Sequence, residues 1–297
     1  MTAALVREHQ VVTLENADNV VLNAPPINDF PDEYFAQHDE DVRVLVEHFP
    51  YMGIASSADA SKLVVLEIGA GVGMHSGLLS DHFGRVLATD IFKYTALREG
   101  TFAAHVAAEH RRHGFPFHAE RIDFITSSAM DLILRDNVAD IGVSINTFEH
   151  IPDPGAALNE LLRCVKQGGY LYIQFDPIWT ADTGSHFLNY VPEPWGHLVY
   201  SEVEFVARMR AAGAEEYEVA SFTDGINKRR YAYFQQILAD GESRGRFTVV
   251  SKTLPEHWWG VVDPSHTSHP FMQKALQLGY TEQELMTRGV RWVLRVS

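Results

Sequence analysis

The feature that most constrains the fold is an alternation of short apolar runs with longer amphipathic stretches, which begins at Lys62. The apolar runs have the length of buried strands, and the stretches between them have helical spacing. Strands that alternate with helices in this way form parallel βαβ units, so the sequence predicts an α/β fold with a doubly wound, mostly parallel sheet. We expect strands at 63–68, 85–89, 121–125, 141–145 and 170–175, and helices at 73–83, 92–113 and 154–165, the last of which ends at Gly168-Gly169.

Both flanks of this segment lack the alternation. Residues 1–61 contain a proline-rich turn and then a helical stretch at 32–49, so we expect an N-terminal helical cap there. Residues 62–297 should form the main domain. Its later part is predicted to contain a helix at 202–212, strands at 217–222 and 290–296, and substrate-covering inserts at about 176–200 and 223–289.

The glycines of residues 65–73 lie where the first predicted strand turns into a helix. Glycines at this position permit a tight turn and a close approach of the backbone to a ligand. A dinucleotide fingerprint would have the spacing G-x-G-x-x-G, but Met74 occupies the sixth position and the third glycine, Gly73, comes one residue early. Glu67, two residues before Gly69, would repel a pyrophosphate and attract a cationic group.

This motif, E-x-G-x-G-x-G, resembles the first motif of the class I S-adenosylmethionine-dependent methyltransferase superfamily, in particular its small-molecule enzymes of the type 11, UbiE/UbiG-like group. The resemblance extends over about 63–175. It implies a Rossmann-like sheet of about seven strands with the last one antiparallel, and S-adenosyl-L-methionine as the cofactor. Further matching pieces follow in order at 85–90, 127–132, 139–144, 149–154 and 162–170.

The resemblance also implies which residues hold the cofactor. Asp90, 21 residues after Gly69, ends the second strand, where an acidic residue holds the ribose hydroxyls. The adenine loop has Ser128 where the family usually has an acidic residue, so the backbone of the next two residues would supply the other contacts. The full predicted set is Glu67, Gly69, Ala70, Gly71, Asp90, Ile91, Ser128, Ala129, Met130 and Asn146.

Candidates for acid–base chemistry are three histidines. His150 follows the fourth strand and titrates near neutrality, although a histidine there also serves to pack against the sheet edge. His186 and His197 belong to a long irregular stretch that is rich in aromatic residues, and such stretches in compact domains are usually functional. Their alternative role is to fix a lid. The residues expected to contact the substrate are Glu149, Trp179, Tyr190 and Trp195.

No spacing supports a metal site, because the chain has neither H-x-x-x-H on a helix nor a cysteine pair. An aromatic group of Trp258, Trp259 and Phe271 is a candidate to close the pocket. A cationic substrate would suit it, whereas packing on the sheet is the plainer interpretation.

The net charge of the chain limits the kinds of binding partner that we expect. The chain carries 24 basic and 39 acidic residues, a net charge of −15, which disfavours a nucleic-acid partner. It has no apolar run long enough for a membrane span, no signal-peptide pattern and one cysteine, which favours a cytoplasmic protein. We therefore expect a methyltransferase that acts on a small amino-acid-like molecule or secondary metabolite, and a homodimer stays open. The alternatives are a non-catalytic S-adenosylmethionine-binding module and a nicotinamide-dependent oxidoreductase, and the attacked atom is undecided among oxygen, nitrogen, sulfur and carbon.

Overall fold

The computed structural model describes residues 31–94, 97–253 and 262–297. Its centre is a seven-stranded sheet with the order β3-β2-β1-β4-β5-β7-β6. The first five strands pair in parallel, and β7 is antiparallel to both of its neighbours. The strands are β1 (Val64–Ile68), β2 (Arg85–Asp90), β3 (Ile122–Thr126), β4 (Ala139–Ile145), β5 (Val165–Phe175), β6 (Phe247–Thr253) and β7 (Val290–Val296). The prediction of a doubly wound, Rossmann-like sheet with an antiparallel last strand is confirmed.

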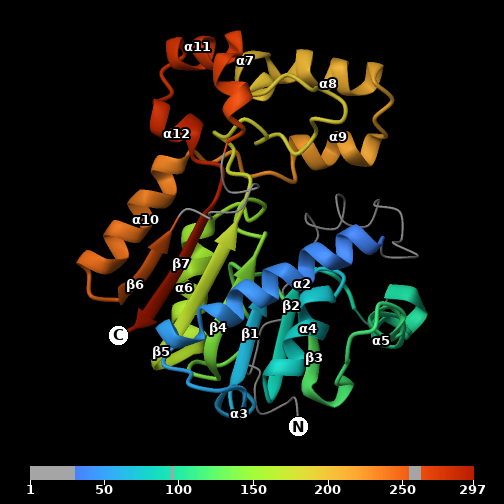
Figure 1. The fold of residues 1–297 in the computed structure, drawn as a ribbon, viewed down its shortest axis with the longest axis vertical. Helices are drawn as coiled ribbons and strands as arrows, with labels where there is room; N and C mark the ends of the chain where they lie inside the picture. Colours follow the sequence, from blue (N-terminus) through green and yellow to red (C-terminus); the bar gives the residue numbers. More distant parts are fainter. Residues whose placement is uncertain (1–30, 95–96, 254–261) are drawn as a thin grey trace.

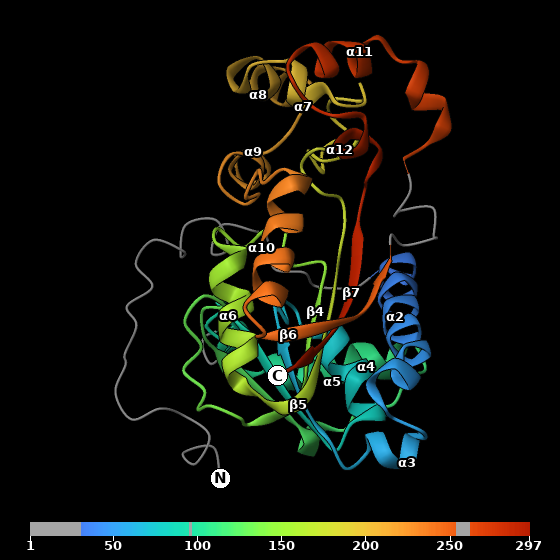
Figure 2. The same cartoon turned by 90° about the vertical axis from the view of Figure 1, so that its left-hand side faces the viewer.

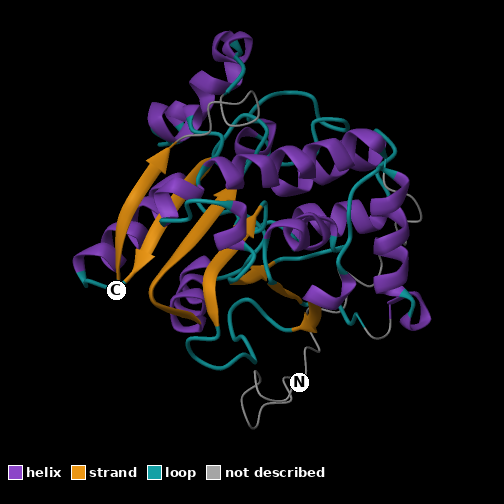
Figure 3. Cartoon of the chain, turned by 60° about the horizontal axis from the view of Figure 1, so that its bottom comes forward, coloured by secondary structure: helices purple, strands orange, loops and turns teal. Residues whose placement is uncertain are grey.

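Helices cover both faces of the sheet (Figures 1, 2 and 3). On one face lie α2 (Asp32–Glu47), α4 (Met74–His82) and α5 (Phe102–Arg112), and on the other lie α6 (Pro154–Cys164) and α10 (Tyr231–Ser243). Consecutive strand residues point to opposite faces, which explains the two cores. Val65 packs in the core on the α2 side, whereas its neighbour Leu66 packs in the core on the α6 side.

The remaining helices form a lobe above the carboxyl ends of the parallel strands (Figure 1). We call this group the helical lobe. It has its own small apolar clusters, one around Phe205, Met209 and Phe222 and another around Trp195 and Leu285. Its helices are α7 (Gly196–Val199), α8 (Glu202–Ala211), α9 (Glu216–Thr223), α11 (Pro270–Gln277) and α12 (Glu282–Met286).

Shorter elements complete the described chain. They are α3 (Ser57–Ala60) and the 3₁₀ turns η2 (Phe49–Met52), η3 (Leu97–Gly100), η4 (Ala119–Arg121) and η5 (Pro264–Ser268). The helical stretch expected at 92–113 is helical only from η3 onward and regular only in α5. No helix in the described ranges is both long and apolar enough to cross a membrane.

Three expectations about elements are corrected. Residues 217–222 form part of α9 rather than a strand, because Glu215 and Glu218 make a capping box that begins a helix. The insert expected at 223–289 contains α10 and the edge strand β6, so only part of it covers the sheet edge. Gly168 and Gly169 lie within β5, which begins directly where α6 ends. The division into a 1–61 cap and a 62–297 domain stays a prediction, and α2 is the part of that cap packed on the sheet.

Candidate active site

The glycine loop between β1 and α4 has a backbone conformation that favours glycine. Gly69, Gly71 and Gly73 all have positive φ values, of 75°, 50° and 80°, which glycine adopts at no steric cost. A Cβ on Gly69 would lie 2.1 Å from Thr147 Oγ1, so the loop after β4 packs directly against this glycine. The two loops that follow neighbouring strands therefore touch at the carboxyl edge of the sheet.

Asp90 fastens this loop to the end of β2. Its Oδ2 accepts a hydrogen bond from the Gly71 N–H at 2.9 Å, and its Oδ1 accepts one from the Phe92 N–H at 3.1 Å. Burial raises the pKa of Asp90, and these N–H donors oppose that rise. Each carboxylate oxygen has a further lone pair, so Asp90 can also accept hydrogen bonds from a ligand. Tyr94 supports the same loop by donating to the Gly71 carbonyl at 3.0 Å.

Glu67 lies behind the loop in the interior. It is 2% exposed, and its Oε2 accepts from Ser76 Oγ at 2.5 Å. Burial raises the pKa of Glu67 to about 7, while nearby His75 lowers it. Its influence on a ligand would thus act through charge and loop support. On the β3 side, Ser128 Oγ accepts from the Met130 N–H at 3.2 Å, which leaves the hydroxyl proton of Ser128 free to donate.

Asn146 ends β4 and meets a residue that sequence reasoning missed. It has a φ of 50°, its Nδ2 lies 3.4 Å from Asp41 Oδ2, and its Oδ1 is buried without a partner. Asp41, on α2, is 1% exposed. It accepts from Gln174 Nε2 at 3.0 Å and lies 3.3 Å from His75 Nε2. An acidic residue on the apolar face of the predicted helix, beside Val42 and Leu45, was the signal that could have found it.

The structure brings Glu149, His150 and His186 together. The rings of His150 and His186 have centroids 5.1 Å apart, and His150 Nε2 lies 3.9 Å from Glu149 Oε1. His150 Nδ1 hydrogen-bonds the Gly225 carbonyl at 2.8 Å, so one of its nitrogens is already committed. Glu149 is 2% exposed, and both Glu149 Oε2 and His186 Nε2 are buried without a partner.

Burial sets the protonation of this group. It raises the pKa of Glu149 well above its usual value, and the nearby Asp176 and Asp41 add to the rise. It lowers the pKa of His186 to about 3, helped by the neighbouring histidines, against a hydrogen bond to the backbone of Pro177. His186 is therefore a neutral imidazole at physiological pH. Its ring is hydrogen-bonded to the backbone of Pro177, and its Nε2 has no partner.

The other predicted residues lie in the helical lobe. His197 Nε2 hydrogen-bonds the Trp179 carbonyl at 2.6 Å, and the two rings have centroids 4.5 Å apart. Burial lowers the pKa of His197 to about 4. Trp195 is fully buried in a lobe cluster. Tyr190 donates its hydroxyl to Glu218 at 2.7 Å on α9, so the structure does not bring it to the Glu149 group.

A buried ion pair ties the lobe to the sheet. Arg288 forms a bidentate ion pair with Asp182, in which Nε donates to Oδ1 at 3.0 Å and Nη2 donates to Oδ2 at 2.6 Å. His266 Nδ1 lies 2.7 Å from Asp182 Oδ2. Asp182 belongs to the 176–200 insert and Arg288 lies two residues before β7, so the insert is anchored next to the last strand.

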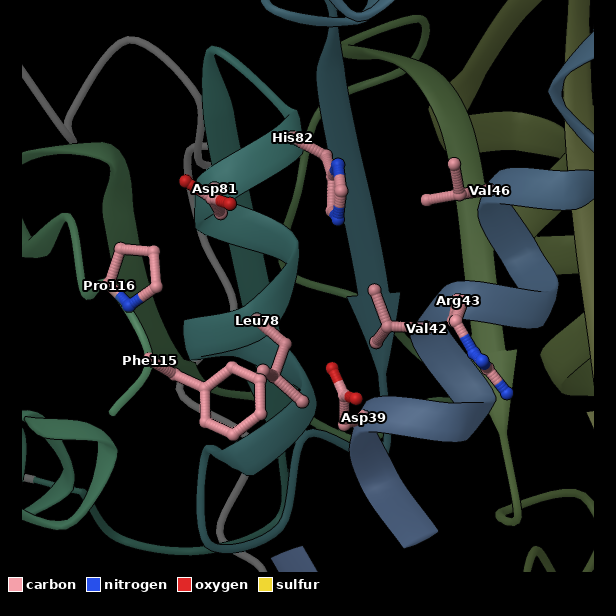
Figure 4. A pocket seen from close by; sticks show the side chains of 9 residues that line it. All are labelled: Asp39, Val42, Arg43, Val46, Leu78, Asp81, His82, Phe115 and Pro116. Atoms are coloured by element: carbon pink, nitrogen blue, oxygen red, sulfur yellow. The ribbon is translucent and has the colours of Figure 1, made fainter. Parts of the chain in front are cut away.

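Two other features lie outside this group. Within the described ranges, no cluster of three or more histidine, cysteine or acidic side chains has metal-binding geometry. Trp258 and Trp259 lie outside the described residues, and Phe271 packs against Tyr200 in the lobe. A pocket between α2 and α4 contains none of the predicted site residues (Figure 4). It is lined by Asp39, Val42, Arg43, Val46, Leu78, Asp81, His82, Phe115 and Pro116.

Comparison with known proteins finds a family match for the region from β1 to β5. Residues 66–173 match the family model described as a methyltransferase domain. The matched segment runs from β1 into β5 and contains the glycine loop and the end of β2, so this part of the chain is similar to methyltransferase domains.

The similarity to curated relatives is partial. The chain is 38% identical over 63 residues to an uncharacterized methyltransferase of Mycobacterium leprae (strain Br4923), which is 21% of this chain and 23% of the relative. It is 28% identical over 122 residues to one of Mycobacteroides abscessus, 41% of this chain and 42% of the relative. It is 25% identical over 134 residues to the chloroplastic tocopherol O-methyltransferase of Arabidopsis thaliana, 44% of this chain and 36% of that enzyme. The chain thus matches less than half the length of each of these relatives.

Among solved structures, the PH0226 protein from Pyrococcus horikoshii OT3 aligns with a TM-score of 0.49 and 15% identity, over 92% of this chain and 97% of that chain.

The residues of the methyltransferase domain fit its cofactor. Asp90 presents acceptor oxygens beside a loop whose glycines leave room for a ligand, and the buried Asn146 Oδ1 offers another unpaired acceptor. The individual contacts assigned to Glu67, Gly69, Ala70, Gly71, Asp90, Ile91, Ser128, Ala129, Met130 and Asn146 stay predictions.

Proposed function

We propose that this chain is an S-adenosylmethionine-dependent methyltransferase whose acceptor is a small molecule, bound between the carboxyl edge of the sheet and the helical lobe. The observation that carries the proposal is the set of buried polar atoms without partners at that edge, namely Asn146 Oδ1, Glu149 Oε2 and His186 Nε2. Buried polar groups in native proteins almost always have hydrogen-bond partners. Unpaired ones at this edge of the sheet are therefore suited to hold ligand groups.

When bound, S-adenosylmethionine supplies an electrophilic methyl carbon on a sulfonium. The part of the protein is then to orient the acceptor and to take its proton. His186 is placed for the second task, because its Nε2 is buried without a partner. Its pKa of about 3 makes it a weak base, so it can take a proton only once the acceptor atom has become strongly acidic by receiving the methyl group. His150, at a ring distance of 5.1 Å, would fix the position of the His186 ring.

His197 is proposed to position the lid. It is hydrogen-bonded to the carbonyl of Trp179 and packed edge-on against that ring, which fixes the stretch that leads to His186. Glu149 is retained as a substrate contact because of its free oxygen. Trp179, Tyr190 and Trp195 would shape the lobe that covers the acceptor.

The size and charge of the acceptor follow from two observations. The helical lobe lies over the sheet edge (Figure 1), which favours an enclosed small molecule over a polymer. The net charge of −15 disfavours a nucleic acid. The tocopherol O-methyltransferase relative acts on a small molecule, which agrees with this class. We include a cytoplasmic location in the proposal, because the single cysteine, Cys164, is buried and unpaired.

The test uses methyl-labelled S-adenosylmethionine with three fractions of a cell extract: small molecules, proteins and nucleic acids. We expect label in the small-molecule fraction with the wild type and not with Asp90→Ala. Label in protein or nucleic acid would contradict the acceptor class. Calorimetric binding of S-adenosylhomocysteine without any transfer would favour the non-catalytic binding module, and binding of NAD instead would favour the oxidoreductase.

A further inference from the structure

Two carboxyl groups meet at the carboxyl edge of the sheet, on loops that follow neighbouring parallel strands. Glu149 lies in the loop after β4, and Asp176 directly follows β5. The two strands are paired up to Ile145 and Gln174, and the Asn146 N–H then donates to the Gln174 carbonyl at 2.8 Å. The loops therefore leave the sheet side by side. Asp41 approaches the same place from α2, through its hydrogen bond to the Gln174 side chain.

Neither carboxyl group is neutralised by the protein. Glu149 Oε2 has no partner, although the side chain is 2% exposed, and His150 is too far from Glu149 Oε1, at 3.9 Å, to donate a hydrogen bond. Asp176 is partly buried and makes no hydrogen bond or ion pair within the described part of the chain. Burying such a group without a partner is unfavourable.

Neither of the two nearby arginines pairs with Glu149 or Asp176, and Arg291 Nη2 is itself buried without a partner. On the β7 side, Arg288 is paired with Asp182, and Arg291 Nε donates to Gln174 Oε1 at 2.7 Å. On the α4 side, His75 lies beside Asp41. Arg288 and Arg291 act on Asp176 only through space, and its pKa still rises to about 7 because of burial and the charge of Asp41. These three carboxyl groups face one nearby guanidinium without a carboxylate partner, so a cation bound among them would stabilise their ionised forms.

We propose that Glu149 and Asp176 form a subsite for a protonated amine of the methyl acceptor. This inference rests on the proposed function and names the chemical class of its substrate. An ammonium group brings three N–H donors and a positive charge, which together satisfy the free Glu149 oxygen and the Asp176 carboxylate. A metal ion is the less suitable occupant, because no described cluster has metal-binding geometry.

The experiment is calorimetry on the full chain saturated with S-adenosylhomocysteine. The probes are three matched pairs that differ in an amine and a hydroxyl: tyramine and tyrosol, glucosamine and glucose, and 1,4-diaminobutane and 1,4-butanediol. We expect an amine to bind at least 10-fold more tightly than its neutral partner in one pair or more. Glu149→Gln and Asp176→Asn should each remove most of that preference, because each removes one carboxylate.

Matched controls separate this effect from a general change of charge. Glu120→Gln and Asp136→Asn remove carboxylates whose side chains are 71% and 65% exposed, and both should keep the preference for amines. Proton release gives a second readout. A bound cation stabilises the ionised form of Asp176, so amine binding at pH 7 should release protons, measured as a difference in heat between two buffers.

The outcomes distinguish this inference from the proposed function. If S-adenosylhomocysteine does not bind, the proposed function fails. If it binds but no probe binds, or neutral probes bind as tightly as amines, only the amine subsite is overturned. An amine preference that persists in both Glu149→Gln and Asp176→Asn also overturns it. Circular dichroism of both variants checks that they are folded.

Discussion

The two ends of the site differ in how their polar groups are satisfied. In the glycine loop and at the end of β2, Asp90 accepts from two backbone N–H groups and Glu67 accepts from Ser76. At the ends of β4 and β5, Glu149 Oε2 and His186 Nε2 have no partners. The first region holds its shape by its own hydrogen bonds. The second leaves groups unpaired that a ligand can satisfy.

This difference separates two tasks. A preformed loop lowers the entropy cost of binding, which suits a cofactor shared by a whole family. Unpaired buried groups raise the cost of the empty state and so discriminate between ligands by the groups they carry. Under the proposed function, the specificity for the acceptor therefore belongs to the β4–β5 end. Substitutions at one end should therefore leave the function of the other end largely intact.

The largest effect is expected at the β4–β5 end. His186→Gln removes the proposed proton acceptor and should lower kcat by about 100- to 10,000-fold. Binding of S-adenosylhomocysteine should stay unchanged, since the glycine loop is not touched. The measurements are turnover with the identified acceptor and calorimetry. His197→Gln is the comparison variant, and it should lower the thermal midpoint and reduce kcat by a smaller factor. Equal losses of kcat in the two variants would mean that both histidines only fix the lid.

Gly69→Ala tests the loop at the opposite end. Its Cβ would collide with Thr147 at 2.1 Å, and its positive φ adds strain. Strain and repacking together should weaken S-adenosylhomocysteine binding by about 100-fold. Gly114→Ala is a suitable control, because Gly114 also has a positive φ, of 81°, but no atom within 4 Å of the added Cβ. Similar affinities in the two variants would show that the contact with Thr147 does not shape the site.

Asp90→Ala removes an acceptor that serves both the loop and the predicted ribose contact. One lost hydrogen bond to a charged group should weaken S-adenosylhomocysteine binding by about 10- to 100-fold in calorimetry. The preference for amines at the other end should persist when the variant is saturated with cofactor. Unchanged cofactor affinity would remove Asp90 from the site.

The smallest effect is on stability. The folded-state pKa of Asp176, about 7, lies above its ordinary value of 3.8, so this group makes the fold less stable as the pH rises from about 4 to about 7. Asp176→Asn should therefore be more stable than the wild type at pH 8, by about 1 kcal/mol after allowing for partial exposure to water, and no more stable at pH 4. Urea unfolding at both pH values measures this. A gain for Asp176→Asn that is the same at both pH values would exclude titration as its cause.

The strands β1 to β5 and their helices were predictable because the hydrophobic period is strong where both faces of the sheet are covered. The strand β6 was missed because it is an edge strand, and its polar residues Thr248, Lys252 and Thr253 are exposed. In α9 the aromatic Tyr217 and Phe222 suggested a strand, whereas Val219 and Phe222, the residues that are buried, have helical spacing.

The residues of the candidate site also differ in how far the sequence could predict them. The predicted partners of the cofactor lie within a few residues of recognisable strand ends, so local spacing located Gly69 and Asp90. Asp41 and Arg291 reach Gln174 from α2 and β7, elements that are distant in the sequence and that carry no motif. Their roles depend on tertiary packing, which brings two ends of the chain together on one strand of the sheet.

The pairing of Asp182 with Arg288 also has a consequence for the order in which the fold assembles. The two residues are 106 positions apart in the sequence, and a contact between such distant residues forms only after a large loss of loop entropy. Gly71 and Asp90 are only 19 positions apart. The glycine loop can therefore form from local contacts, whereas the insert that carries His186 is anchored only once β7 has docked between β5 and β6.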